Sequence, residues 1–143
     1  MIKAERIGHV VLKVRDVQRS RAFYTEVLGM DVMMEIPAIP AVFLANNRRD
    51  HHEIALFEVG AEAEGLHAKQ IGLAHVAFRL RNEKELRAAY EEFKEKHVPR
   101  SPSPLTTASR RAFIFATPTG TSSKYIATIR PKTLPSSPTR IWG

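Results

Sequence analysis

The sequence contains no cysteine, and this absence excludes a first group of functions. Without a thiol, the chain cannot form disulfides, bind zinc through thiolates or use a cysteine nucleophile. It also has no apolar run long enough to cross a bilayer, and residues 1–6 lack the apolar stretch of a signal peptide. We therefore expect a soluble, cytoplasmic protein with no membrane partner.

Acidic residues are absent from the last third of the chain. Glu95 is the last of the 15 acids, so residues 1–95 contain every acid and 14 of the 22 bases, a net charge of −1. The overall charge of +7 therefore comes from the final 48 residues, where the bases are scattered among Pro, Ser and Thr. They form neither a helical stripe nor an aromatic platform, so we expect no nucleic-acid partner.

An internal repeat is the main positive feature of the 143 residues, 43% of which are hydrophobic. Residues 7–14 read IGHVVLKV, and residues 73–80 read LAHVAFRL. The offset is 66 residues, at which His9 matches His75 and Tyr24 matches Tyr90. A repeat of this length predicts two similar modules, each beginning with a strand and a helix.

Alternation along these strands predicts the direction of the two histidines. Residues two apart in a strand share a face of the sheet. One face is apolar in each copy, and the histidine of each copy points the other way. The apolar residues are Val10, Leu12 and Val14 in the first copy, and Val76, Phe78 and Leu80 in the second.

Each strand is followed by a predicted helix. Asp16 is the expected N-cap of the first helix, which should end at Gly29, and Asn82 with Glu85 forms a capping-box-like start for the second. The faces expected to be buried carry Val17, Ser20, Tyr24 and Val27 in the first helix, and Leu86, Ala89, Tyr90 and Phe93 in the second. We interpret the tyrosines and Phe93 as packing residues.

The remaining strands complete the domain boundaries. We expect strands at residues 32–36, 41–45, 53–59, 111–115 and 124–129. The predicted organisation is a first β-α-β-β-β module at 1–59, a linker at 60–72, a second module at 73–130 and an irregular tail at 131–143. The fold class is therefore α+β.

Four segments carry a resemblance to a known family: GHVVLKVRD at 8–16, FYTEVLGM at 23–30, HHEIALFEV at 51–59 and GLAHVAFRL at 72–80. With them, the chain from about residue 5 to residue 115 resembles the vicinal oxygen chelate superfamily. This superfamily includes glyoxalase I, bleomycin and fosfomycin resistance proteins, methylmalonyl-CoA epimerase and extradiol dioxygenases. The resemblance implies a curved, cup-like mixed sheet built by two β-α-β-β-β modules around one divalent metal ion.

The resemblance also implies the metal ligands. The family's first-strand ligands correspond to His9 and His75, and a further ligand from the fourth strand corresponds to Glu53 or to the adjacent His51 or His52. We favour Glu53 and expect His51 and His52 at the surface. Imidazole and carboxylate suit Fe, Mn, Zn, Ni or Co, among which the sequence does not distinguish. Such an ion would polarise a carbonyl, stabilise an enediolate or orient O2 beside a catecholate.

The family's last glutamate has no counterpart in this chain. Residues 116–125 read ATPTGTSSKY, in which Pro118 and Gly120 occupy the places of Pro and Gly in the family's Asp-Pro-Asp-Gly. Reading the overlapping codons in a shifted frame can spell that motif, with a glutamate from the Ser123 and Lys124 codons. One hypothesis is therefore a frameshift near Ala116, which would also explain the acid-free ending.

Several functions follow from the resemblance. The favoured one is a metal-dependent enzyme acting on a small molecule with vicinal oxygens, and within that class an extradiol-type ring-cleaving dioxygenase. The alternatives are a ligand-binding protein of the bleomycin-resistance type that needs no metal, an isomerase or lyase of the glyoxalase I or epimerase type, and a catalytically inert remnant. The expected partners are a small-molecule substrate and a second copy of the chain in a homodimer.

Overall fold

The structure is a computed structural model that describes residues 2–36, 38–65, 67, 69, 71–100, 105–107, 110–117 and 122–128. The chain divides into two compact units. The first comprises Met1–Ala74 with Thr117–Thr121, and the second comprises His75–Ala116 with Ser122–Gly143. In the described part of the chain, no helix has the length and apolar character needed to span a membrane.

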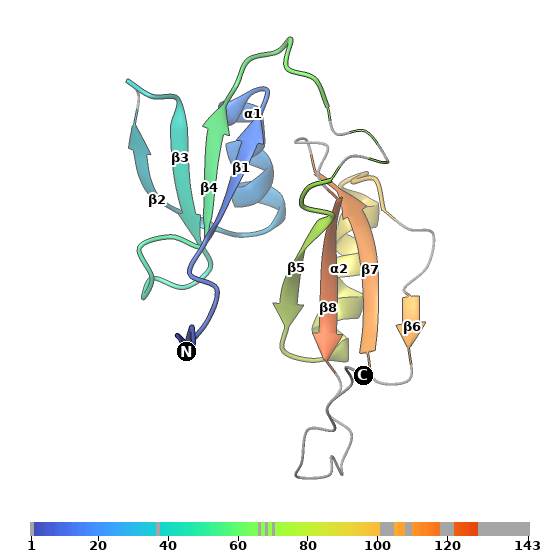
Figure 1. The fold of residues 1–143 in the computed structure, drawn as a ribbon. Helices are drawn as coiled ribbons and strands as arrows, with labels where there is room; N and C mark the ends of the chain where they lie inside the picture. Colours follow the sequence, from blue (N-terminus) through green and yellow to red (C-terminus); the bar gives the residue numbers. More distant parts are fainter. Residues whose placement is uncertain are drawn as a thin grey trace. The chain divides into compact units, whose positions relative to one another are not determined.

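The first unit is a four-stranded mixed sheet with one helical segment. Its elements are β1 (Val10–Val14), α1 (Val17–Ala22), the π-helical turn η1 (Phe23–Val27), β2 (Asp31–Ile36), β3 (Ala41–Ala45) and β4 (Ile54–Glu58). The sheet order is β1-β4-β3-β2, with β1 parallel to β4 and the other pairs antiparallel (Figure 1). The predicted β-α-β-β-β order of this module is confirmed.

The second unit repeats this topology. Its elements are β5 (His75–Leu80), α2 (Glu83–Glu95), β6 (Leu105–Thr107), β7 (Arg110–Ala116) and β8 (Ser122–Thr128), in the sheet order β5-β8-β7-β6. Again the first and last strands are parallel. The short strand β6 was not predicted individually, and β8 begins two residues before the expected start. The predicted tail at 131–143 lies outside the described residues.

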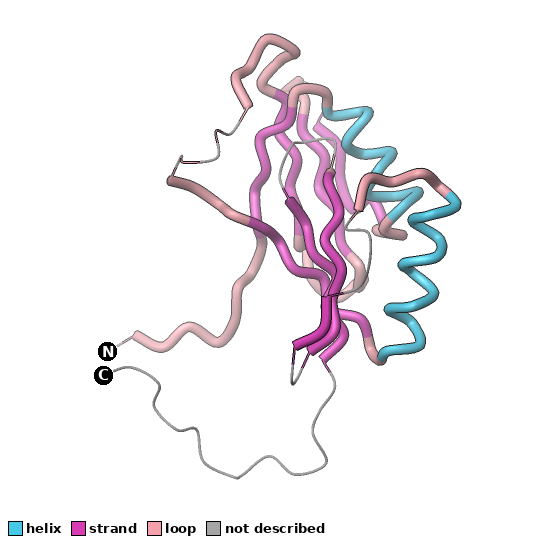
Figure 2. The backbone as a smooth tube through the Cα atoms, turned by 90° about the vertical axis from the view of Figure 1, so that its right-hand side faces the viewer, coloured by secondary structure: helices cyan, strands magenta, loops and turns pink. Residues whose placement is uncertain are grey.

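Within each unit the helix covers one face of its own sheet (Figure 2). Leu12 and Val14 of β1 are buried beneath α1 with Leu56 of β4, whereas Val11 on the other face is 51% exposed. In β5 the same alternation recurs, with Val76, Phe78 and Leu80 the less exposed residues. The predicted facing of both strands is confirmed, because the apolar side of each strand is the side on which the helix of its unit packs.

The first helix begins as predicted and then departs from α-helical geometry. The Asp16 carboxylate accepts the Arg19 N–H at 2.8 Å, and Glu58 of β4 accepts the Val17 N–H at 2.9 Å. The Leu28 N–H donates to the Phe23 carbonyl, five residues back, which is the π-helical pattern. This wider turn leaves Val27 half-buried rather than fully buried as expected. The helix ends at Gly29, whose φ of 68° favours glycine.

The second helix follows the predicted capping closely. Asn82 Oδ1 accepts the Glu85 N–H at 3.0 Å, while the Glu85 carboxylate accepts the Arg81 N–H at 3.0 Å. Leu86 and Phe93 are buried, each 1% exposed. The expected partners Ala89 and Tyr90 are only half-buried, so the buried stripe is narrower than the sequence suggested.

Candidate functional site

His9 and Glu53 lie at the same end of two neighbouring strands. The Val10 N–H donates to the Glu53 carbonyl at 2.9 Å, immediately before the paired run Val10↔Ile54 begins. His9 is exposed and Glu53 is half-buried. Parallel pairing of β1 with β4 therefore places His9 and Glu53, two of the three predicted ligands, at matching positions of neighbouring strands. Both positions are on the face of the sheet that α1 leaves uncovered.

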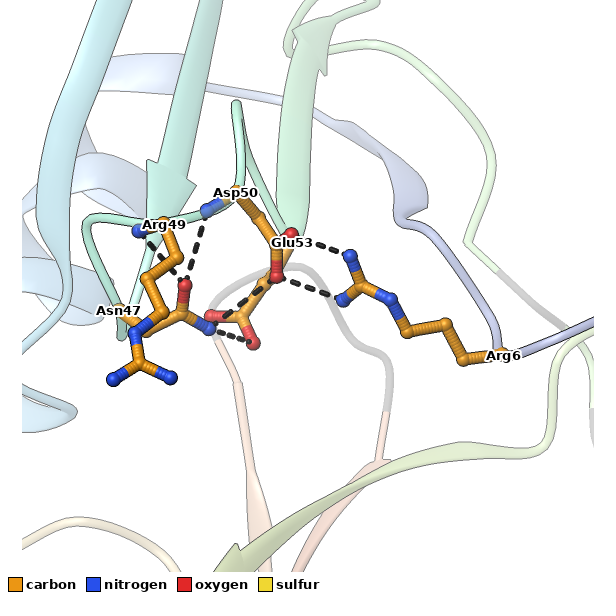
Figure 3. A network of polar contacts seen from close by, with 5 residues as sticks. All are labelled: Arg6, Asn47, Arg49, Asp50 and Glu53. Atoms are coloured by element: carbon orange, nitrogen blue, oxygen red, sulfur yellow. Dashed lines mark hydrogen bonds and ion pairs between the residues drawn. The ribbon is translucent and has the colours of Figure 1, made fainter.

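The carboxylate of Glu53 is already hydrogen-bonded within the loop that precedes β4. Its Oε2 accepts the Asn46 N–H at 2.6 Å. Its Oε1 accepts Asn47 Nδ2 at 3.2 Å, as Figure 3 shows. The same Asn47 accepts the N–H groups of Arg49 and Asp50 through Oδ1, both at 3.1 Å. Glu53 thus stabilises the turn at 46–50, and binding a metal would compete with those bonds.

A bidentate ion pair fastens this loop to the segment that leads into β1. The Arg6 guanidinium donates to both oxygens of Asp50, at 2.8 and 2.5 Å (Figure 3). This contact lowers the pKa of Asp50 to about 2, mainly through the hydrogen bond from Arg6. The segment carrying His9 and the loop carrying His51, His52 and Glu53 are therefore held together at two points: this ion pair and the start of the β1–β4 ladder.

The imidazole of His52 lies against that of His9. Their ring centroids are 4.5 Å apart, and the ring of His52 also contacts Phe43 at 4.9 Å and His51 at 4.8 Å. Burial lowers the pKa of His52, and the neighbouring His9 and His51 lower it further, which favours the neutral imidazole. His51 is exposed as expected, but His52 is half-buried rather than a surface residue.

His75 opens β5 and is exposed, on the side of its strand opposite Val76 and Phe78. Its Cα partner in the parallel ladder is Ser122, the first residue of β8. No acid occurs in Ser122–Thr128, so the glutamate that the resemblance implied on this strand is missing. His9 and His75 belong to different units.

The donor chemistry fits a divalent ion in part. Exposed or half-buried imidazoles are good ligands for such ions, and His9, His52 and His75 meet this requirement. Glu53 fits less well because its carboxylate is bound by the turn. Among the described residues, no group of three or more histidines and acids converges to hold a metal. The contact between His9 and His52 is the feature that sequence reasoning missed, since it depends on the conformation of the loop before β4.

Comparisons with known proteins agree with this fold. A family model described as the Glyoxalase/Bleomycin resistance protein/Dioxygenase superfamily matches residues 6–122. A crystal structure of a glyoxylase/bleomycin resistance protein/dioxygenase domain from Frankia sp. EAN1pec superposes with a TM-score of 0.74. That superposition covers 89% of this chain and all of the other at 17% identity, and so shows the fold alone.

Two curated relatives are dioxygenases. The chain is 33% identical over 106 residues to biphenyl-2,3-diol 1,2-dioxygenase 3 of Rhodococcus globerulus, covering 71% of this chain and 53% of the relative. It is 31% identical over 80 residues to catechol-2,3-dioxygenase of Bacillus subtilis (strain 168), covering 56% of this chain and 28% of the relative. The chain thus spans about half or less of the length of these relatives.

The repeated β-α-β-β-β units, each a mixed four-stranded sheet with a helix on one face, define the class of protein. The chain belongs to the glyoxalase/bleomycin resistance protein/dioxygenase superfamily, because the family model matches most of its length.

Proposed function

We propose that this protein is a metal-dependent enzyme that acts on a small molecule with vicinal oxygens, as an extradiol-type ring-cleaving dioxygenase. The observation that carries this proposal is the sequence identity of 31% over 80 residues and 33% over 106 residues with two dioxygenases. The family also includes isomerases and lyases. We favour ring cleavage over these reactions because both relatives are dioxygenases. The chain spans only part of each relative, and the activity of the whole relative is therefore a proposal for this chain.

His9 and His75 are the proposed first ligands of one divalent ion, whereas Glu53, the third ligand that the resemblance implied, has both carboxylate oxygens bonded within the turn. Support comes from their equivalence: His9 immediately precedes β1 and His75 is the first residue of β5, and each of these edge strands pairs in parallel with the last strand of its unit. We propose that the protein acts as a homodimer. A bound ion would supply the charge that draws two neighbouring substrate oxygens to the site.

The chain's own side chains would supply the rest of the substrate site. On the face of the first sheet that α1 leaves uncovered, Phe43 and Phe57 meet edge to face with ring centroids 6.0 Å apart. Phe43 also contacts His52. These aromatic rings next to imidazoles favour a planar aromatic substrate, since stacked or edge-on ring contacts are each worth about 0.5–1.5 kcal/mol.

The test is oxygen uptake by the protein reconstituted with Fe(II) or Mn(II) under anaerobic conditions and then mixed with a panel of catechols. Uptake should require both the metal and the catechol, and should be lost in His9→Ala and His75→Ala. The panel should be repeated with a glutamate restored on β8. Absence of uptake in both forms would contradict the dioxygenase assignment.

A ligand-binding protein without catalysis is the second candidate, favoured by the missing carboxylate on β8. With one predicted ligand lost, the remaining imidazoles compete less well with water for the ion. His75→Ala separates the two functions. An enzyme should lose metal and activity, whereas a binding protein that stays folded should keep its ligand.

A further inference from the structure

The loop before β4 presents a second imidazole to His9. With metal–nitrogen bonds of about 2.0–2.1 Å, two imidazoles on one ion have centroids roughly 4.5 Å apart at a right angle and about 5.2 Å apart at the tetrahedral angle. The observed centroid distance between His9 and His52 is 4.5 Å, with an angle of 44° between the ring planes. This centroid separation lies at the lower end of the range that a shared ion would set.

The contact between His51 and His52 engages Nδ1 of both rings, so Nε2 is the nitrogen of His52 that lies outside this contact. Their Nδ1 atoms are 2.6 Å apart, so one must donate and the other must accept. If His52 donates its Nδ1–H to His51, the lone pair of His52 Nε2 is left for a metal. A ligating histidine commonly donates its other N–H to a neighbouring acceptor in this way, which fixes the tautomer.

The carboxylate of Glu53, unlike Nε2 of His52, has its oxygens engaged in hydrogen bonds. Both of its carboxylate oxygens accept hydrogen bonds from the turn at 46–50, one from a backbone N–H at 2.6 Å and one from Asn47 at 3.2 Å. Turning this carboxylate toward an ion would leave the Asn46 N–H without its partner. His52 needs no such rearrangement, and Phe43 and the Arg6–Asp50 ion pair already hold its loop in place.

We propose that His52, through Nε2, is the ligand that joins His9 in the first unit, and that Glu53 serves the turn instead. This inference rests on the metal dependence proposed above. It makes the metal-binding half of this unit a pair of imidazoles, which favours borderline ions such as Zn²⁺, Co²⁺ and Ni²⁺ over Mg²⁺ or Ca²⁺. His51 is then a positioning residue that orients His52.

The first experiment titrates the full chain with Zn²⁺ alone and follows the side-chain ¹⁵N signals of the histidines. Nε2 of His52 should move to the shift of a coordinated nitrogen together with one nitrogen of His9. If His9 responds and the ring of His52 does not, the assignment of His52 is overturned while the metal site itself stands. If no histidine responds at saturating Zn²⁺, both are overturned.

Variants give the second, independent readout, which is the Zn²⁺ affinity measured by calorimetry. His52→Ala and His9→Ala should each weaken binding about tenfold or more, whereas Glu53→Gln should stay within about twofold of the wild type because its carboxylate is not a ligand. His67→Ala, an exposed histidine of the same unit, is the matched control. Thermal melts establish that each variant folds. Loss of binding in Glu53→Gln with retention in His52→Ala would reverse the assignment.

Discussion

The guanidinium of Arg6 binds both carboxylate oxygens of Asp50, 44 residues further along the chain. Because Asp50 lies in the loop that carries His51 and His52, this ion pair connects the approach to β1 with the approach to β4. Bidentate pairing of arginine with a carboxylate adds geometric precision as well as attraction. Arg6 is exposed and Asp50 is half-buried, so solvent keeps the contribution of this pair to stability small and its main effect is to position the two segments.

The first prediction concerns the titration of Asp50. Its pKa should be about 2, below the ordinary value of 3.8, because Arg6 stabilises the charged carboxylate. A lowered folded-state pKa means that this contribution to stability is present above pH 3.8 and is lost as the pH falls through about 2. The carboxyl ¹³C shift of Asp50 measures this directly. In Arg6→Gln the pKa should return toward 3.8; an unchanged low value would show that Arg6 is not the cause.

The second prediction concerns the start of α1. Glu58 accepts the Val17 N–H across 41 residues, and so links β4 to the helix that covers it. Replacing Glu58 with Ala removes the acceptor and should lower the free energy of unfolding by about 1 kcal/mol, as for other lost helix caps. Urea unfolding monitored by circular dichroism measures the change. Glu62→Ala, at an exposed residue in the following turn, should have no measurable effect.

The third prediction separates the two faces of the first sheet. Leu56 of β4 is 0% exposed beneath α1, and Val11 of β1 is 51% exposed on the other face. Leu56→Ala should cost about 2–5 kcal/mol of unfolding free energy through lost burial and a cavity, while Val11→Ala should cost less than about 1 kcal/mol. Equal effects in urea unfolding would mean that the uncovered face is packed against something in solution.

Much of this architecture could be predicted from the sequence. The 66-residue repeat and the alternation along β1 and β5 predicted the strand–helix start of each module and the facing of His9 and His75, and the cap-forming residues Asp16 and Asn82 predicted where the helices begin. The cause is local, since a strand facing one helix must alternate apolar and polar residues. The π-helical turn at η1 could not be predicted in this way, because no periodicity of the sequence signals its bond from the Leu28 N–H to the Phe23 carbonyl.

The site was less accessible to sequence reasoning for a related reason. The segment HHEI offers three candidate ligands in a row, and nothing in its composition says which one turns toward β1. The hydrogen bonds of Glu53 to the turn, and the ring contact of His52 with His9, arise from a loop conformation held by residues as distant as Arg6. Ligand choice at a loop therefore needs the tertiary structure.

The fourth prediction concerns the tautomer of His52. If its Nδ1–H donates to His51, long-range ¹H–¹⁵N spectra at neutral pH should show a protonated Nδ1 and an unprotonated Nε2. His51→Ala removes the acceptor, and the Nδ1–H form of His52 should then lose population. An unprotonated Nδ1 in the wild type would reverse the donor and acceptor roles of the pair, and would leave Nε2 unable to bind a metal without a proton shift.

The fifth prediction restores the missing carboxylate on β8. The register pairs His75 with Ser122 and Ala77 with Lys124, so position 124 lies on the same face of the second sheet as His75. The shifted reading frame also draws its glutamate from the codons of Ser123 and Lys124. Lys124→Glu should therefore raise the affinity for Zn²⁺ or Co²⁺ by about tenfold or more, since a carboxylate adds both a ligand and a negative charge.

Lys124→Gln is the matched control for this variant, because it removes the positive charge without adding a carboxylate. If the gain in affinity comes only from relief of charge repulsion, both substitutions should raise it equally in calorimetric titrations. If the carboxylate is a ligand, only Lys124→Glu should do so, and the gain should disappear when His75→Ala is added, because contacts within one metal site are not additive. Equal gains that survive His75→Ala would show that β8 takes no part in metal binding and would favour the ligand-binding function over the enzyme.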